Sequence, residues 1–125
     1  MRKNNETEFS MSDFYNAVGG NMEEVIDRLE DIDLVKTSIF EFLEDPSYAE
    51  LMESLENHDI ESAFRSAHTL KGICYTFGFK RLGDVSAAVC EKLRGGCLPT
   101  KDALHLLTQE YGCVLRAIHK LPNCR

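Results

Sequence analysis

One long stretch decides the fold of this chain: residues 60–77 read IESAFRSAHTLKGICYTF. At about 100° per residue, one side of the stretch collects residues that a packed core accepts. These are Ala63, Ser66, Leu70, Ile73, Cys74 and Phe77. Asn57-His58-Asp59 before the stretch is a turn and cap, and Gly78 after it is a helix stop. The sequence therefore predicts an amphipathic helix from about Ile60 to Phe77.

The remainder of the chain reads as further helices separated by caps and turns. Ser12 is expected to cap a helix that ends at Gly19-Gly20, Asn21 to cap the next, and Asp45-Pro46 to separate two more. Apolar residues recur at helical spacing over about 33–43, 46–57, 80–94 and 100–120. No segment alternates with a period of two between turn residues, so essentially no sheet is expected.

These elements predict an all-α fold, an antiparallel four-helix bundle with one or two short additional N-terminal helices. Its core helices are expected near 33–57, 60–77, 80–94 and 100–120. At 125 residues the chain has room for one domain with one core. We expect a polar, loose N-terminal segment over residues 1–11 and a single helical domain over 12–125.

Charge is distributed unevenly along the chain. The net charge of −7 argues against nucleic-acid binding, because no overall cationic field is present to neutralise phosphates. From Glu23 to Glu61 there are fourteen acidic and two basic residues, a pattern typical of a solvated face. From Arg65 to Arg94 there are six basic and two acidic residues, so this second segment is the one that favours an anion.

Other features indicate an ordinary soluble protein. No apolar run approaches the roughly 20 residues that span a bilayer, and the start MRKNNE lacks the apolar stretch of a signal peptide, so we expect a cytoplasmic monomer. The five cysteines form no CxxC pair and are expected to be reduced thiols, several of them in the core. His58, His105 and His119 lack ligand-spaced partners, so no metal site is expected.

His68 lies on the side of the long helix opposite its apolar stripe. A solvated face is usually charged, but this one combines His68 with Lys71, Gly72 and large aromatic residues. A glycine inside a helix costs about 0.5–1 kcal/mol relative to alanine, and Gly72 is directly alongside His68 at i+4. Its missing side chain opens space beside the imidazole, and Lys71 at i+3 can place an ammonium next to a bound anion. These residues favour a functional site without settling its chemistry.

The run Ala67-His68-Thr69-Leu70-Lys71-Gly72, followed by Gly78 and Arg81-Leu82, closely resembles the signature of histidine phosphotransfer domains. In that signature AHTLKG is followed by a second glycine six residues after the first. The similarity extends to Phe42-Leu43-Glu44-Asp45-Pro46-Ser47 and covers about residues 12–120. Two segments depart from the pattern: 73–77 is bulkier than usual, and Leu93-Arg94 stands where a Leu-Glu pair is common.

The resemblance implies a phosphoryl carrier in a multistep two-component phosphorelay, without ATP-binding or autokinase machinery. It makes His68 the phosphoacceptor through Nε2, Lys71 the residue that stabilises the phosphoryl group, and Gly72 the residue that gives steric access. The partners implied are receiver domains of response regulators or hybrid histidine kinases. No cofactor is expected on this chain, and the Mg²⁺ and the aspartate are expected in the partner receiver domain.

The helical projection also predicts a docking surface. Phe64, Tyr75 and Phe79 are expected to form an apolar rim around His68, with Arg65 and Lys80 as a positive rim for an acidic partner.

Two alternatives remain open. One is a helical-bundle adaptor that docks a receiver domain or another signalling partner without carrying phosphate. The other is a four-helix bundle that binds a metal or cofactor, which would need inward Glu-x-x-His sets. The residues three before each histidine are Leu55, Arg65, Asp102 and Arg116, so no such set is present.

Overall fold

The computed structural model describes residues 8–122, and every regular element within them is helical. The helices are α2 (Met11–Val18), α3 (Met22–Leu29), α4 (Ile32–Glu41), a 3₁₀ turn η1 (Phe42–Glu44), α5 (Ser47–Glu56), α6 (Ile60–Phe77), α7 (Lys80–Arg94) and α8 (Lys101–Lys120). No strand occurs in this part of the chain. The predicted all-α fold is confirmed.

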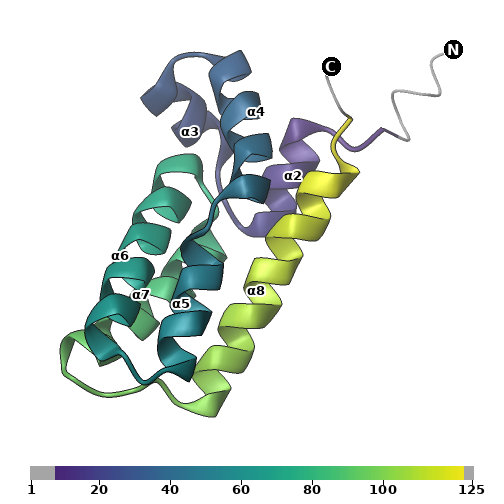
Figure 1. Ribbon diagram of the computed structural model, residues 1–125. Helices are drawn as coiled ribbons and strands as arrows, with labels where there is room; N and C mark the ends of the chain where they lie inside the picture. Colours follow the sequence, from purple (N-terminus) through teal and green to yellow (C-terminus); the bar gives the residue numbers. More distant parts are fainter. Residues whose placement is uncertain (1–7, 123–125) are drawn as a thin grey trace, which may run out of the picture.

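Helices α5, α6, α7 and α8 form the four-helix bundle (Figure 1). Helix α6 packs between α5 and α7, and α7 packs on α8. The α5–α8 side is closed by the rings of Tyr48 and Tyr111, which stack at 3.8 Å, and by a 2.9 Å hydrogen bond between the hydroxyls of Tyr48 and Thr108. Helices α2, α3 and α4 lie at one end of the bundle, where α2 packs against the long α8 (Figure 1). The segment 33–57, predicted as one side of the bundle, therefore contributes only its second half, α5.

Two predicted helix boundaries differ from the structure. Ser10, and not Ser12, caps α2: its hydroxyl accepts from the Asp13 N–H at 3.0 Å, and the Asp13 carboxylate accepts from the Ser10 N–H. Ser10 and Asp13 thus form a reciprocal capping box. Because residues 1–11 are predicted to be loose, the sequence-based prediction places the cap two residues too late. Residues 1–7 of that segment lie outside the described residues. The predicted helix over 33–43 ends at Glu41 and continues as η1.

The inward face of α6 is rotated slightly from the predicted stripe. Its buried residues are Ala63, Ala67, Leu70 and Cys74, whereas Ser66, Ile73 and Phe77 are only partly buried. A stripe at positions i, i+4, i+7 and i+11 contains two alanines, and small side chains allow α6 to approach its neighbours closely. The rotation leaves His68 and Thr69 exposed, so the predicted outward side of the helix is retained.

An aromatic cluster joins the bundle to the end that carries α2 and η1. The Phe79 ring packs edge-to-face on Phe14 of α2 at 5.8 Å and on Phe42 of η1 at 5.0 Å between centroids. Phe42 in turn contacts Tyr111 of α8 at 5.9 Å. Edge-to-face geometry adds to the area that these rings bury. Phe79, fully buried, lies at the centre of this cluster.

The carboxyl end of α6 is held by residues from distant parts of the chain. The last carbonyls of a helix lack partners within the helix. Here the Tyr15 hydroxyl donates to the Phe77 carbonyl at 2.8 Å, and Arg28 donates to the carbonyls of Tyr75 and Thr76 at 3.0–3.2 Å. Helix α6 then ends at Gly78 with φ 84°, where a Cβ would lie 2.5 Å from a methyl carbon of Val25. These contacts anchor α2 and α3 on the end of the helix that carries His68.

We expect Arg28→Met to lower the free energy of unfolding by about 1–2 kcal/mol, because two carbonyls at the end of α6 lose a charged donor and α3 loses an anchor. Urea denaturation followed by circular dichroism measures this change. Arg116→Met is the matched control, since Arg116 is exposed on α8 with no hydrogen bond or ion pair among the described residues. An equal loss in both variants would contradict the capping role of Arg28.

Arg81 links α7 to α2 and α8. Its guanidinium pairs with Glu110 of α8 at 3.1 Å and donates to the Ala17 carbonyl at the end of α2. Leu82 beside it is fully buried. The Arg81-Leu82 pair therefore serves the packing of the bundle, at a distance from the exposed face of α6.

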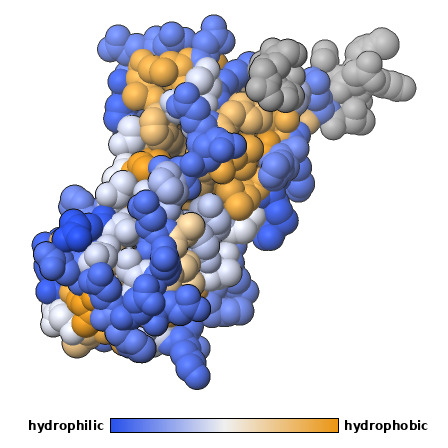
Figure 2. Space-filling view, in the orientation of Figure 1, coloured by the Kyte–Doolittle hydropathy of each residue, from blue (hydrophilic) through white to orange (hydrophobic). Residues whose placement is uncertain are grey.

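On the face drawn in Figure 2, most of the apolar surface lies away from α5 and α6. Figure 2 shows the apolar residues of this face mainly over the end that holds α2, α3 and α4, whereas the surface over α5 and α6 is largely hydrophilic. Ile32 and Leu34 of α4 are among the exposed large apolar residues. Within the described residues, no helix combines the length and apolar character that crossing a membrane requires.

Candidate functional site

His68 lies near the middle of α6 with its side chain exposed to solvent. The helix begins at the Asp59 cap, whose carboxylate accepts from the Ser62 N–H at 3.1 Å, and ends at Gly78. This hydrogen bond is the largest cause that lowers the pKa of the Asp59 carboxyl. Both ends of α6 are capped, which stabilises the helix that carries the imidazole.

Gly72 and Lys71 lie one turn after His68, as the sequence predicts. A Cβ built on Gly72 would meet no neighbouring atom within 4 Å, so the space beside the imidazole is open. Lys71 is half-buried, and within residues 8–122 no carboxylate pairs with it. Within this range its ammonium therefore makes no ion pair that an incoming anion would have to displace.

Phe64 lies against the imidazole from the preceding turn. The two rings are 5.9 Å apart between centroids with an interplanar angle of 42°. Phe64, Arg65, His68 and Thr69 line a shallow hollow on the surface. Arg94, the last residue of α7, places its guanidinium carbon 5.1 Å from the centroid of the Phe64 ring. The structure thus brings a cation to this face that the predicted site did not include.

Tyr75 is held on the same face of α6 by contacts with α7. Its ring lies against Gly83, where a Cβ would be only 2.7 Å from a ring carbon, and its hydroxyl donates to Asp84 at 2.7 Å. Burial and this hydrogen bond raise the pKa of Tyr75 to about 12. The hydrogen bond from Tyr75 lowers the pKa of the Asp84 carboxyl, and Lys80 also lowers it. Tyr75 remains 40 % exposed, so it offers a fixed, partly apolar surface.

The predicted rim is wrong at Phe79, which is fully buried in the aromatic cluster and is not available to a partner. The two basic residues of the rim are exposed but paired. Arg65 lies 3.1 Å from Glu61, and Lys80 lies 3.2 Å from Asp84. Exposed pairs of this kind are worth at most about 1 kcal/mol, so either cation is free to exchange its carboxylate for one on another protein.

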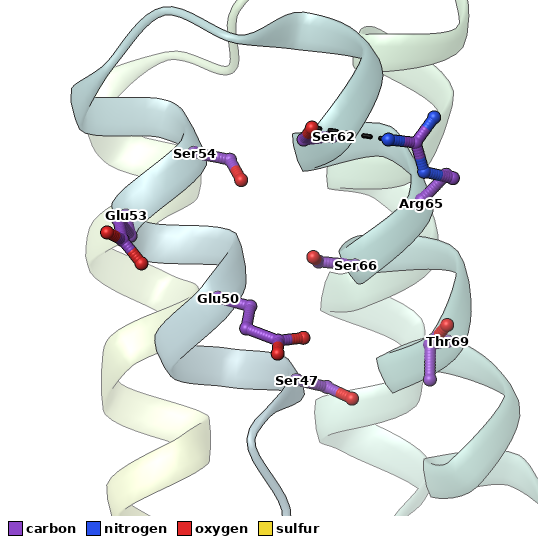
Figure 3. Close-up of a pocket in the computed structure, with 8 residues that line it drawn as sticks. All are labelled: Ser47, Glu50, Glu53, Ser54, Ser62, Arg65, Ser66 and Thr69. Carbon is purple, nitrogen blue, oxygen red and sulfur yellow. Dashed lines mark hydrogen bonds between the residues drawn. The ribbon is translucent and has the colours of Figure 1, made fainter.

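A hydrophilic groove of about 350 Å³ runs between α5 and α6 beside this face (Figure 3). Hydroxyl groups line it from both helices, with Glu50 of α5 directed towards α6 and Arg65 bonded to Ser62 at 3.3 Å. The full lining is Ser47, Glu50, Glu53, Ser54, Ser62, Arg65, Ser66 and Thr69. Arg65 and Thr69 also border the hollow at His68, so the groove leads to the histidine.

The other histidines lie on other elements. His58 is exposed in the turn before α6 with φ 56°, and His105 and His119 are exposed on α8. In the described part of the chain, no three His, Cys, Asp or Glu side chains gather in a way that could hold a metal ion. Cys74 and Cys90 are buried thiols, Cys113 is partly buried and Cys97 is exposed, while Cys124 lies outside the described residues.

Sequence reasoning missed two side chains from other helices that contact α6, Arg28 and Arg94. No local sequence pattern links Arg28 to the end of α6, because the two lie 47 or 48 positions apart. Arg94 could have been found, because α6 and α7 form an antiparallel pair around Gly78, which places position 94 opposite position 64. The pairs Tyr75–Asp84 and Phe64–Arg94 follow this register.

Taken together, these features define a class: a helical bundle with an exposed histidine on a capped helix that also carries a lysine and a glycine one turn further on. The model of the Hpt domain family matches residues 21–117, and the chain belongs to this family. Hpt domains are phosphocarriers, not kinases, and they interact with receiver domains of two-component systems. Searches of curated proteins and of solved structures returned no match.

Proposed function

We propose that this chain relays a phosphoryl group between the aspartates of two receiver domains through a phosphohistidine at His68. The observation that carries the proposal is the exposed imidazole of His68 beside the open space at Gly72. A receiver domain must bring its phosphoaspartate within bonding distance of a ring nitrogen, and a side chain at position 72 would stand in its way. Lys71 supports the same role, since its ammonium favours a phosphoryl group beside the ring.

The transfer is an in-line displacement at phosphorus. The lone pair of the neutral imidazole, at Nε2 by resemblance to the family, forms the N–P bond while the bond from phosphorus to the aspartate oxygen breaks. The electron pair of that bond leaves with the carboxylate, and the ring retains its proton on the other nitrogen. Transfer to the next receiver reverses these changes. In this proposal the divalent ion and the acidic residues around it belong to the receiver domain, and this chain contributes the nucleophile and Lys71.

Incubation with a receiver domain that carries radiolabelled phosphoaspartate tests the proposal. We expect label on this chain that is stable in base and lost in acid, because phosphohistidine is acid-labile, and we expect it in the peptide that contains His68. Addition of a second, unphosphorylated receiver domain should remove the label. Binding of a receiver without uptake of label would instead support a non-phosphorylated adaptor, and label on another residue would refute the assignment of His68.

The docking surface in this proposal consists of Phe64 and Tyr75 around His68, with Arg65 and Lys80 at its border. Phe64→Ala should slow transfer from a phosphorylated receiver roughly tenfold, because the ring that lies 5.9 Å from the imidazole supplies apolar contact area to the partner. Phosphorylation of His68 by phosphoramidate, a small donor that needs no docking surface, should change little.

Tyr75→Phe is the matched variant for Tyr75, since it keeps the ring and removes only the bond to Asp84. We expect it to transfer nearly as fast as the parent protein, whereas Tyr75→Ala should be slowed with receiver and unaffected with phosphoramidate. An equal loss with both donors would indicate a damaged fold and would remove the docking role from these rings.

A further inference from the structure

Arg94 is placed at the border of the face that carries His68 by two successive contacts. Its guanidinium lies over the Phe64 ring at 5.1 Å, and that ring lies against the His68 imidazole at 5.9 Å. The first contact joins the end of α7 to the first half of α6. A guanidinium over an aromatic face is held there by the negative charge density of the ring. Arg94 is therefore oriented towards the site although it belongs to another helix.

Lys71 and Arg94 act on the same stretch of α7. Burial raises the pKa of the Cys90 thiol, and the charges of Lys71 and Arg94 partly oppose that increase. The positive charges of Lys71 and Arg94 thus both lie near the contact between α6 and α7. Lys71 follows His68 along α6, and Arg94 lies beside the Phe64 ring, which precedes His68. A negatively charged surface that meets His68 would encounter both.

The existing partner of Arg94 is weakly held. Arg94 pairs with Glu91 at 3.1 Å within the last turns of α7, and both side chains are more than half exposed. Such a pair contributes at most about 1 kcal/mol, because water competes for both charges. A carboxylate from a docking protein, brought into the partly desolvated border of an interface, can replace Glu91 while Phe64 keeps the guanidinium in place.

We propose that Arg94 is a specificity-determining residue, whose guanidinium pairs with a carboxylate on the surface of the receiver domain next to its phosphoaspartate. The inference rests on the proposed function and names the charge that the receiver must present. Arg94 touches neither phosphorus nor the imidazole, so it selects partners and contributes to encounter, and the chemistry at His68 does not depend on it. Receivers with a basic residue at the facing position are disfavoured by like charge.

The experiment compares Arg94→Glu with Lys92→Glu in the full chain. Lys92 is exposed on the same turn of α7 and makes no ion pair within the described residues, so both variants change the net charge equally. The donor is the phosphorylated receiver domain that transfers fastest to the parent protein in a panel of isolated receivers. We expect Arg94→Glu to lower kcat/KM by about tenfold at low salt, with Lys92→Glu within about twofold, and the difference to shrink at high salt. Arg94→Lys should retain most of the rate.

The decisive test is whether a reversed charge on the receiver domain compensates for Arg94→Glu. Replacement of single surface Asp or Glu residues of the receiver by Lys should yield one variant that restores the rate of Arg94→Glu and slows the parent protein. Equal effects of Arg94→Glu and Lys92→Glu, or the absence of any such compensating position, would overturn the inference. Phosphorylation by phosphoramidate separates it from the proposed function: if His68 of the parent accepts no phosphoryl group, the proposed function fails, whereas normal acceptance by all variants leaves only the role of Arg94 in question.

Discussion

His68→Gln is expected to abolish phosphoryl acceptance and leave the fold intact. Glutamine has a similar size and polarity, but its amide nitrogen offers no basic lone pair for attack at phosphorus. The side chain is exposed and contributes little to the core, so the helix content and the unfolding midpoint should be those of the parent protein. Uptake of label from a phosphorylated receiver, measured beside circular dichroism, tests both parts. Uptake that persists in this variant would exclude His68 as the phosphoacceptor.

Lys71→Ala should weaken the same reaction roughly tenfold and not eliminate it, because the ammonium stabilises the phosphoryl group without forming a bond to it. The controls are His58→Gln, His105→Gln and His119→Gln, which change exposed histidines outside α6. Each of these should accept phosphate at the parent rate. Loss of acceptance in one of them with His68 still reactive would move the site elsewhere.

Phe79→Ala is expected to lower the free energy of unfolding by about 3–5 kcal/mol, the range for removal of a large buried ring. The ring is fully buried between Phe14 and Phe42, so its loss opens a cavity where α2, η1 and the start of α7 meet. The total free energy of unfolding of a domain of this size is about 5–15 kcal/mol. The variant should therefore unfold at a much lower urea concentration or temperature. Denaturation followed by circular dichroism gives the difference.

Tyr75→Ala serves as the control for that measurement, because Tyr75 is also aromatic and only four residues away, but 40 % exposed. It should cost clearly less stability than Phe79→Ala. Phe79→Leu should recover part of the loss, since it refills much of the volume. A Phe79→Ala protein as stable as the Tyr75→Ala protein would contradict the central place of Phe79 in the core.

Much of α6 followed from local sequence. The bounds of α6 agree with the predicted Ile60 and Phe77, since Asp59 and Gly78 are strong end signals that act on their immediate neighbours. The relation among His68, Lys71 and Gly72 is equally local, because i+3 and i+4 spacing places side chains on one face of any α-helix. The Hpt family model matches residues 21–117, which include this segment.

Phe79 is the predicted rim residue that local sequence patterns placed incorrectly. The projection that placed it beside His68 treated the helix as continuous past Phe77. Gly78 adopts φ 84°, which turns the chain and directs Phe79 inward to the rings of Phe14 and Phe42. Phe14 and Phe42 come from helices far away in the sequence, so no local pattern identified them as its neighbours.

By itself the sequence determined the all-α class, the limits of α6 and the shared face of His68, Lys71 and Gly72, because helix caps and helical spacing act within a few residues. Only the tertiary structure decided which aromatic residues are exposed and which fill the core. It also placed Arg28 on the end of α6 and Arg94 over Phe64. Contacts of this kind join residues 30 to 50 positions apart, and they depend on how whole helices pack against one another.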